Sequence, residues 1–372
     1  MPKPDEILKQ YLTEVGVAIN GSAPWDIQVH DERFFSRVLR NGSLGLGESY
    51  MEAWWDCERI DELICRILKG NLETKVKLNF RMLLSYLSSR LFNRQSSARA
   101  PIIAKKHYNL GNDLFFSFLD PYNQYSCAYF HDTDDLAEAQ LKKLDLICRK
   151  IDLHSGEHVL DIGCGWGGFA RYAAEHYGCN VTGVNISDEQ IRYAREFCHG
   201  LPVEIRSEDY RKLRGSFDKI VSVGMIEHVG VKNYRKFMRI VHRCLKDGGV
   251  FLLHTIGGNV SRMNTDPWID RYIFPNGMLP SIAQLGRAME NLFVVEDIHN
   301  LGPHYEKTLL SWHKNFLNAW KKIETTYNAM FKRMWEFYLL SCAGSFRARN
   351  IQLWQFVMSK QGDAQPPLVR AG

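Results

Sequence analysis

The sequence predicts an α/β protein in which a doubly wound parallel sheet follows a smaller, mainly helical region. Three observations lead to this fold class. Five short apolar segments between residues 158 and 256 alternate with helical segments, which is typical of a parallel sheet. A glycine-rich turn follows the first of these segments, and the chain before residue 100 shows no such alternation. The 372 residues are enough for two domains, which we assign to 1–100 and 101–372.

The part of the chain before the predicted sheet contains three segments. Residues 1–100 have a predominantly helical pattern, interrupted by NGS at 20–22 and NGSLGLGES at 41–49. An aromatic-rich segment follows at 107–130. A helix predicted at 136–151 then leads into the first strand.

The predicted strands are short and are separated by helical segments or turns. They are HVLDIG (158–163), NVTGVNI (180–186), VEIRSED (203–209), DKIVSVG (218–224) and VFLLHTI (250–256). Ser187, with Gln190 three residues later, predicts a capping box at the start of a helix over 187–198. After Gly257 the pattern loosens into WIDRYIFPNGMLPS, and LWQFVMS near the C-terminus predicts a last strand.

Composition excludes several classes of protein. The hydrophobic fraction of 45% and the charged fraction of 24% are ordinary for a folded soluble chain. No window approaches the ~20 apolar residues of a membrane span. The opening MPKPDEILKQYL has early acids and no apolar core, so we expect no secretory signal. The nine cysteines are scattered without the spacing of a zinc site, which favours reduced thiols in the cytoplasm and no metal.

The segment 66–106 is strongly basic. It holds 10 Lys or Arg against one acid, whereas 1–65 holds 6 against 12. As a helix it would gather Phe80, Leu83, Leu84, Leu87 and Leu91 on one face, and Lys77, Arg81, Ser85, Ser88 and Ser89 towards the other. Such a helix can lie on an anionic membrane surface, or it can pack on the core as an ordinary surface helix, which is the commoner case. No DNA- or RNA-binding signature is present, so we expect no nucleic-acid partner.

The turn after the first predicted strand is VLDIGCGWGGFA, at 159–170. Its glycines allow a tight turn and a close approach of backbone N–H groups to a ligand. A lone GxGxxG would also fit a nicotinamide cofactor, but here Asp161 lies two residues before Gly163, and Gly165 follows. With this pattern the chain resembles the Rossmann-like S-adenosylmethionine-dependent methyltransferases. The resemblance implies that Gly163 and Gly165 flank the amino-acid part of the cofactor.

The same resemblance implies further contacts with S-adenosylmethionine. Asp209 would meet the adenine amine, and Tyr210 would lie beside the adenine ring. Many such enzymes carry an acid at the end of the second strand for the ribose hydroxyls, whereas this chain has Asn185, with Gln190 within reach from the next helix. The full set of implied cofactor contacts is Tyr125, Ser126, Asp161, Gly163, Gly165, Asn185, Ile186, Gln190, Asp209 and Tyr210.

Four further sequence blocks narrow the resemblance. They are YSCAYF (125–130), SVGMIEHVG (222–230), FLLHTIG (251–257) and GPHYEKTL (302–309). Together with HYNLGNDLF and the glycine loop, they closely resemble the bacterial cyclopropane-fatty-acyl-phospholipid synthases and, more distantly, the mycolic acid cyclopropane synthases. The likeness extends over nearly the whole chain. It implies transfer of a methylene group from S-adenosylmethionine to the cis double bond of a phospholipid acyl chain.

The implied chemistry passes through a carbocation and needs a base to remove a proton from the added methyl group. Water must be excluded, and a protein carboxylate touching the cation risks alkylation, so a small bound base is chemically sensible. The resemblance implies that this base is bicarbonate, held by Glu227, His254, Tyr305, Cys127 and Ile256. We expect His254, the Tyr305 hydroxyl and the N–H groups of Cys127 and Ile256 to donate to it, and Glu227 to accept its proton.

Cys127, within QYSCAYF, has four conceivable roles: nucleophile, disulfide partner, metal ligand or pocket wall. The dispersed cysteines disfavour the disulfide and the metal site. Neither methyl transfer nor ring closure needs a covalent enzyme intermediate, which disfavours the nucleophile. We therefore interpret Cys127 as a residue that lines the pocket and faces the anion. His228 is a further candidate ligand of the anion, which we rank below Glu227.

The resemblance also implies partners and a location. We expect membrane phospholipids with unsaturated acyl chains as substrates, peripheral association with the inner face of the cytoplasmic membrane, and a homodimer. A lipid substrate favours the membrane interpretation of 66–106. Two alternatives remain. One is a methyltransferase acting on a phospholipid headgroup or a small amine, which leaves the set Cys127, Glu227, His254 and Tyr305 unexplained. The other is an inactive membrane-binding protein that keeps the fold.

Overall fold

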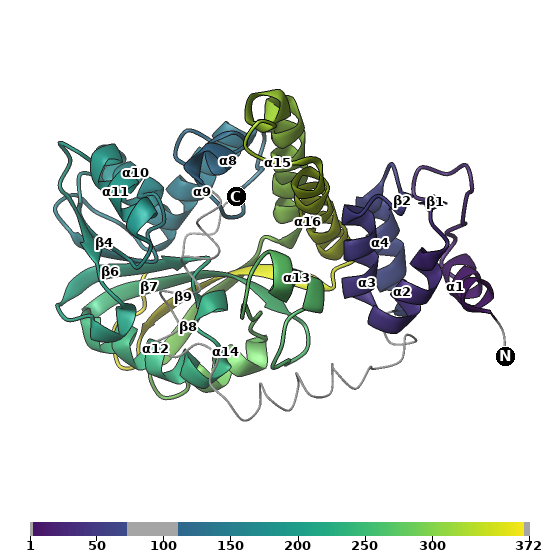
Figure 1. The fold of residues 1–372 in the computed structure, drawn as a ribbon. Helices are drawn as coiled ribbons and strands as arrows, with labels where there is room; N and C mark the ends of the chain where they lie inside the picture. Colours follow the sequence, from purple (N-terminus) through teal and green to yellow (C-terminus); the bar gives the residue numbers. More distant parts are fainter. Residues whose placement is uncertain (1–2, 73–110, 368–372) are drawn as a thin grey trace. The chain divides into compact units, whose positions relative to one another are not determined.

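The computed structural model describes residues 3–72 and 111–367 and divides into two compact units (Figure 1). The first unit comprises Met1–Phe92, Met263–Pro275 and Tyr305–Ile351, and the second comprises Asn93–Arg262, Asn276–His304 and Gln352–Gly372. Most of the basic segment 66–106 and the predicted boundary at residue 100 lie outside the described residues. The boundary therefore stays a prediction.

The first unit is mainly helical, as the sequence predicts. Its described elements are α1 (Pro4–Thr13), β1 (Gln28–Val29), α2 (Arg33–Asn41), α3 (Ser43–Met51), β2 (Trp55–Asp56), α4 (Ile60–Lys69), α13 (Pro267–Tyr272), most of α15 (Gly302–Ile323) and α16 (Ala329–Arg347). The strands β1 and β2 form an antiparallel pair. Helix α16 packs against α3 and α4. A Cβ on Gly344 would lie 2.4 Å from the carbonyl oxygen of Asp61, so glycine allows the close approach of α16 to α4.

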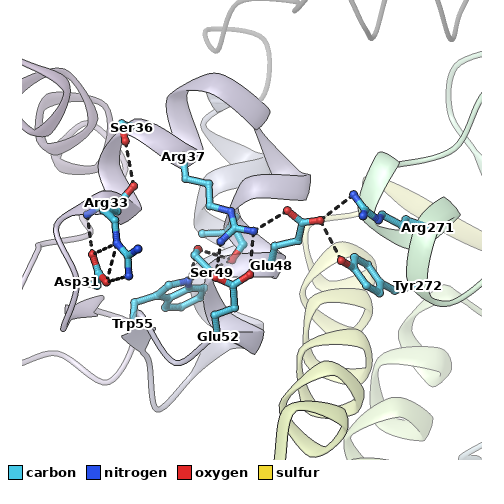
Figure 2. A network of polar contacts seen from close by, with 11 residues as sticks. Asp31, Arg33, Ser36, Arg37, Glu48, Ser49, Glu52, Trp55, Arg271 and Tyr272 are labelled. Atoms are coloured by element: carbon cyan, nitrogen blue, oxygen red, sulfur yellow. Dashed lines mark hydrogen bonds and ion pairs between the residues drawn. The ribbon is translucent and has the colours of Figure 1, made fainter.

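A buried carboxylate joins segments of the first unit that are distant in sequence (Figure 2). Glu48 of α3 is 9% exposed and accepts a hydrogen bond from Arg37 of α2 at 2.9 Å. Its other oxygen accepts from the Tyr272 hydroxyl at 2.9 Å and pairs with Arg271 at 3.0 Å. Because a buried charge is costly unless it is paired, this arrangement attaches α13 firmly to the N-terminal helices.

The second unit contains a seven-stranded sheet within the described residues. Its strands are β3 (His158–Ile162), β4 (Asn180–Asn185), β5 (Val203–Ser207), β6 (Phe217–Val223), β7 (Leu245–Gly258), β8 (Phe293–Asn300) and β9 (Ile351–Lys360). They are ordered β5-β4-β3-β6-β7-β9-β8, with β3 to β7 parallel and β8 antiparallel to β9. The five predicted strands and the predicted last strand are confirmed.

Helices cover both faces of this sheet (Figure 1). They are α8 (Asn112–Phe116), α9 (Leu136–Lys150), α10 (Gly168–Tyr177), α11 (Asp188–Phe197), α12 (Val231–Cys244) and α14 (Ile282–Met289), with short 3₁₀ helices η1 (Tyr210–Lys212) and η2 (Ile226–His228). Side chains of α9 and α10 form one hydrophobic core with the strands, and side chains of α12 and α14 form another. The predicted doubly wound α/β architecture is thereby confirmed.

Two details differ from the sequence prediction. The capping box predicted at Ser187 is wrong, because Ser187 makes no capping side-chain bond and the Gln190 side chain instead accepts from Asn185. Strand β8 was not assigned from the sequence. It is an edge strand with a bulge between Val295 and Asp297, so its apolar residues do not alternate regularly.

Candidate active site

The glycine loop between β3 and α10 adopts backbone conformations that glycine takes most readily. Gly163, Gly165 and Gly167 have φ angles of 86°, 54° and 84°. A Cβ on Gly168 would lie 1.9 Å from the carbonyl oxygen of Tyr122, so the segment around Tyr122 packs directly on the loop. The loop follows the carboxyl end of β3, where ligands bind in open α/β sheets.

Asp161, in β3 just before the loop, is 2% exposed. Its Oδ2 atom has no hydrogen-bond partner among the described residues. Burial raises the pKa of Asp161 to about 7, and the positive charge of Lys143 opposes that shift. A buried carboxyl oxygen without a protein partner is the kind of group that a polar ligand satisfies. Its contact with a cofactor stays a prediction.

The Asn185 side chain links the glycine loop to the first turn of α11. Its Oδ1 accepts from the N–H of Ile186 at 2.7 Å. Its Nδ2 donates to Gln190 Oε1 at 2.9 Å and to the carbonyl oxygen of Gly165 at 3.2 Å. Asn185 and Gln190 therefore stabilise the turn between β4 and α11. Their predicted ribose contacts stay predictions.

Asp209 and Tyr210 follow the end of β5. Asp209 accepts from the N–H of Arg211 at 2.9 Å and pairs with its guanidinium at 2.7 Å. The Tyr210 ring packs edge-on against Phe237 of α12, with 5.4 Å between ring centroids, and burial raises the pKa of its hydroxyl. The structure thus places both residues just after the carboxyl end of β5, and their adenine contacts stay predictions.

The ends of β6 and β7 bring three of the predicted anion-site residues together. Strand register pairs Val223 with His254, and Glu227 lies in η2, just after β6. The N–H of Ile256 donates to Glu227 Oε1 at 2.7 Å. Glu227 Oε2 and His254 Nε2 are buried and have no hydrogen-bond partner among the described residues. A polar ligand at this edge of the sheet would satisfy both atoms.

Burial controls the protonation of these side chains. It raises the pKa of Glu227 to about 7 and lowers the pKa of His254 well below its ordinary value, to which the charges of Lys143 and Lys150 also contribute. His254 is therefore neutral at neutral pH. Its Nδ1 lies 3.2 Å from Nε2 of Gln355 on β9. With this amide donating to Nδ1, the imidazole proton is on Nε2, which makes Nε2 a hydrogen-bond donor.

Cys127 and Tyr305, the other two predicted anion-site residues, have different surroundings. Cys127 is fully buried, and its thiol lies 3.2 Å from the carbonyl oxygen of Ala128 and 3.8 Å from that of Leu301. Tyr305 belongs to the first unit, where its ring packs against Trp312 and Phe346, among other residues. The anion-binding roles of both residues stay predictions. His228 is only partly buried, and desolvation by its surroundings lowers its pKa to about 4.

Comparisons with known proteins identify the family. The family described as mycolic acid cyclopropane synthetase matches residues 95–356. Over 354 residues, which are 95% of this chain and 93% of the relative, the sequence is 53% identical to the cyclopropane-fatty-acyl-phospholipid synthase of Escherichia coli strain K12. The chain belongs to this family of cyclopropane synthases.

Solved structures of cyclopropane synthases have the same fold. The cyclopropane synthase MmaA2 from Mycobacterium tuberculosis matches with a TM-score of 0.65 and 31% identity, over 70% of this chain and 98% of its own. The mycolic acid cyclopropane synthase CmaA1, solved with SAH and CTAB, matches with a TM-score of 0.65 and 33% identity, over the same shares of the two chains. The predicted Rossmann-like S-adenosylmethionine-dependent methyltransferase fold is confirmed.

Sequence reasoning missed three polar residues of this cyclopropane synthase that form hydrogen bonds with the candidate site residues Ser126 and His254. Gln140 and Lys143 of α9 and Gln355 of β9 are completely buried. Gln140 and Lys143 lie three residues apart on the helix face that also carries the buried Leu136 and Leu144. The sequence pattern that could have revealed Gln140 and Lys143 is a polar pair on an otherwise apolar helix face. Such side chains are rarely buried unless they form hydrogen bonds.

Proposed function

We propose that this enzyme transfers a methylene group from S-adenosylmethionine to the cis double bond of an unsaturated phospholipid acyl chain, forming a cyclopropane ring. The 53% identity over 95% of the chain to the Escherichia coli synthase named for this product carries the proposal. S-adenosylmethionine supplies an electrophilic methyl group when bound. The acyl double bond attacks that methyl group, and loss of a proton from the added carbon lets the ring close.

The strand order supports separate, neighbouring regions for binding the cofactor and for binding the base. Because β6 lies between β3 and β7, the glycine loop after β3 lies at the same end of the sheet as Glu227, just after β6, and His254, which pairs in β7 with the last residue of β6. The loop and Asp161 would hold the cofactor. Glu227 and His254 would then organise the base beside the reacting carbon. The buried environment of both side chains keeps water from a carbocation.

Bicarbonate is our proposed base, and the atoms available at the site fit it. The Nε2–H of His254 would donate to one of its oxygens, and Glu227 Oε2 would accept its proton. The pKa of Glu227, near 7, lets this carboxyl gain or lose a proton at neutral pH. The N–H of Ile256 acts here by fixing Glu227. The Tyr305 hydroxyl and the N–H of Cys127 complete the proposed set.

A product assay tests the reaction. The purified enzyme is incubated with S-adenosylmethionine and vesicles of a phospholipid that carries cis-unsaturated chains, and both the intact phospholipid and its released fatty acids are examined by NMR. Cyclopropane protons with loss of the olefinic signal support the proposal. A methylene gain confined to the headgroup would favour the alternative methyltransferase, and unchanged lipid would favour an inactive membrane-binding protein.

Dependence on bicarbonate has its own test. The same reaction is run in buffer freed of dissolved carbon dioxide and then supplemented with bicarbonate. We expect the wild-type rate to fall in the first buffer and to recover in the second. A rate that is indifferent to bicarbonate would remove it from the mechanism without affecting the identity of the product.

The basic segment 66–106 is our proposed membrane contact, on the strength of its sequence and of a substrate that resides in the bilayer. No helix in the described part of the chain is long and apolar enough to span a bilayer. A variant with Lys77, Arg81, Arg90 and Arg94 made neutral should sediment less with anionic vesicles at low salt than the wild type. Equal sedimentation would contradict this role.

We also propose a homodimer associated with the inner face of the cytoplasmic membrane, as the resemblance to the family implies. In a dimer, one subunit could stay bound to the membrane while the other catalyses the reaction. Sedimentation equilibrium of the full chain should give twice the 43.1 kDa of one chain. Cell fractionation with and without a high-salt wash should move the protein from the membrane to the soluble fraction. A monomer, or a salt-resistant membrane fraction, would contradict these assignments.

A further inference from the structure

One face of α9 reaches the segment that carries the predicted cofactor and anion contacts. Lys143 is completely buried, and its ammonium group donates to Gln124 Oε1 at 2.5 Å and to Ser126 Oγ at 2.9 Å. Gln140, one turn earlier, donates to the carbonyl oxygens of Ser126 at 2.9 Å and Gln124 at 3.3 Å. The helix thus binds both the backbone carbonyl groups and the side chains of Gln124 and Ser126.

The chemistry of these bonds fixes the direction of the Ser126 hydroxyl. An ammonium group has three donors and no acceptor, so Ser126 Oγ must accept from Lys143. The Ser126 proton is then left to donate elsewhere. Gln124 is oriented in the same way, because its Oε1 accepts from Lys143 while its Nε2 donates to the carbonyl oxygen of Tyr122 at 3.1 Å.

The surroundings keep this ammonium group in place. Asp120 accepts from the N–H groups of Gln124 and Tyr122, both at 2.8 Å, and its negative charge favours the charged form of Lys143. Asp161 does the same from β3. Burial lowers the pKa of Lys143 to about 8, so Lys143 remains mostly charged at neutral pH. A buried cation is thus bound to the segment 124–126 and feels the charge of Asp161 in β3.

We propose that Lys143 is a positioning residue for S-adenosylmethionine, which it serves by making the Ser126 hydroxyl a donor towards an acceptor on the cofactor. This inference rests on the proposed cofactor site. Lys143 itself does not touch the cofactor. Its charge and its two hydrogen bonds hold 124–126 over the glycine loop, where the packing of Tyr122 on Gly168 leaves little space for movement.

A double-mutant cycle tests the proposal. Binding of S-adenosylhomocysteine is measured by calorimetry on the full-length wild type, Lys143→Met, Ser126→Ala and the double variant. We expect each single variant to bind about tenfold more weakly, since a hydrogen bond to a charged group contributes about 1.5 kcal/mol. Because both changes remove the same directed donor, the double variant should bind at most about threefold more weakly than the weaker single variant.

Lys150→Met is the matched control. Lys150 lies two turns further along α9 and is also buried. It pairs with Asp297 at 3.5 Å, and its ammonium group lies 3.0 Å from Nδ1 of His299. Its loss should lower the thermal stability while leaving the affinity for S-adenosylhomocysteine within about twofold of the wild type. A merely structural role of Lys143 would instead give the two lysine variants the same behaviour.

Unchanged affinity in Lys143→Met, or losses that multiply in the double variant, would overturn the proposal. If Lys143→Met does not fold, Lys143→Gln replaces it in the cycle under the same criteria, and failure of both to fold assigns Lys143 a structural role only. The cyclopropane assay is run on the same wild-type preparation. Wild-type protein that binds S-adenosylhomocysteine but makes no cyclopropane lipid would refute the proposed function while leaving the positioning role in place.

Discussion

Glu227→Gln replaces a buried carboxyl by an amide of nearly the same size. In the wild type, Oε1 accepts from the N–H of Ile256 at 2.7 Å, and a glutamine oxygen can keep that bond. The amide can neither take up nor release a proton. We therefore expect the variant to lose most of its cyclopropane synthesis, by at least about 30-fold, since a hydrogen bond to a charged group contributes about 2 kcal/mol.

The same change should stabilise the protein at alkaline pH. Burial raises the pKa of Glu227 from its ordinary 4.5 to about 7. The contribution of a carboxyl with a raised pKa is complete below the unfolded value and is lost as the pH rises through the folded value. Relative to a pH below the unfolded pKa, the shift lowers the free energy of unfolding by about 3 kcal/mol at about pH 8 and by about half that at about pH 5.5. Glutamine removes this loss.

Urea unfolding followed by circular dichroism, at about pH 5.5 and about pH 8, measures the effect. The gain in free energy of unfolding for Glu227→Gln over the wild type should be larger at the higher pH by about 2 kcal/mol. The wild type should also lose stability between these two conditions. A variant that is less stable than the wild type at the higher pH, or a gain that does not depend on pH, would refute the assignment of Glu227 as a buried, destabilised carboxyl.

Two further predictions concern Cys127 and the glycine loop. Cys127→Ser should keep its rate within about threefold of the wild type, because a hydroxyl can also donate to the carbonyl oxygens that the thiol approaches. A folded variant without activity that still binds S-adenosylhomocysteine would restore a nucleophilic role for Cys127. Gly168→Ala should lower the free energy of unfolding by about 1–3 kcal/mol and weaken S-adenosylhomocysteine binding, since its Cβ would collide with the Tyr122 carbonyl. Its control is Gly286→Ala, where a Cβ on α14 meets nothing within 4 Å and alanine should add about 0.5–1 kcal/mol; equal effects of the two changes would contradict the collision.

The sequence by itself predicted the architecture of the second unit and placed the candidate site residues at the carboxyl ends of its parallel strands. The alternation of apolar segments predicts the parallel strands, because a strand buried between two helical layers must be apolar along its length. The glycine loop and the residues at strand ends such as Glu227 and His254 could be placed at one edge because parallel strands end together. The four sequence blocks narrowed the resemblance from methyltransferases in general to the cyclopropane synthases. The 53% identity to the Escherichia coli enzyme agrees with that assignment.

Only the tertiary structure revealed which buried side chains form hydrogen bonds with the candidate site residues, and how burial shifts the pKa values there. Lys143, Gln140 and Gln355 are ordinary polar residues in the sequence, and their partners lie 14 or more positions away in the chain. Periodicity reports which face of a helix is buried, but a hydrogen bond depends on which atoms the fold brings within about 3 Å. The pKa of Glu227 likewise depends on desolvation, which is a property of the packed unit and not of any local pattern.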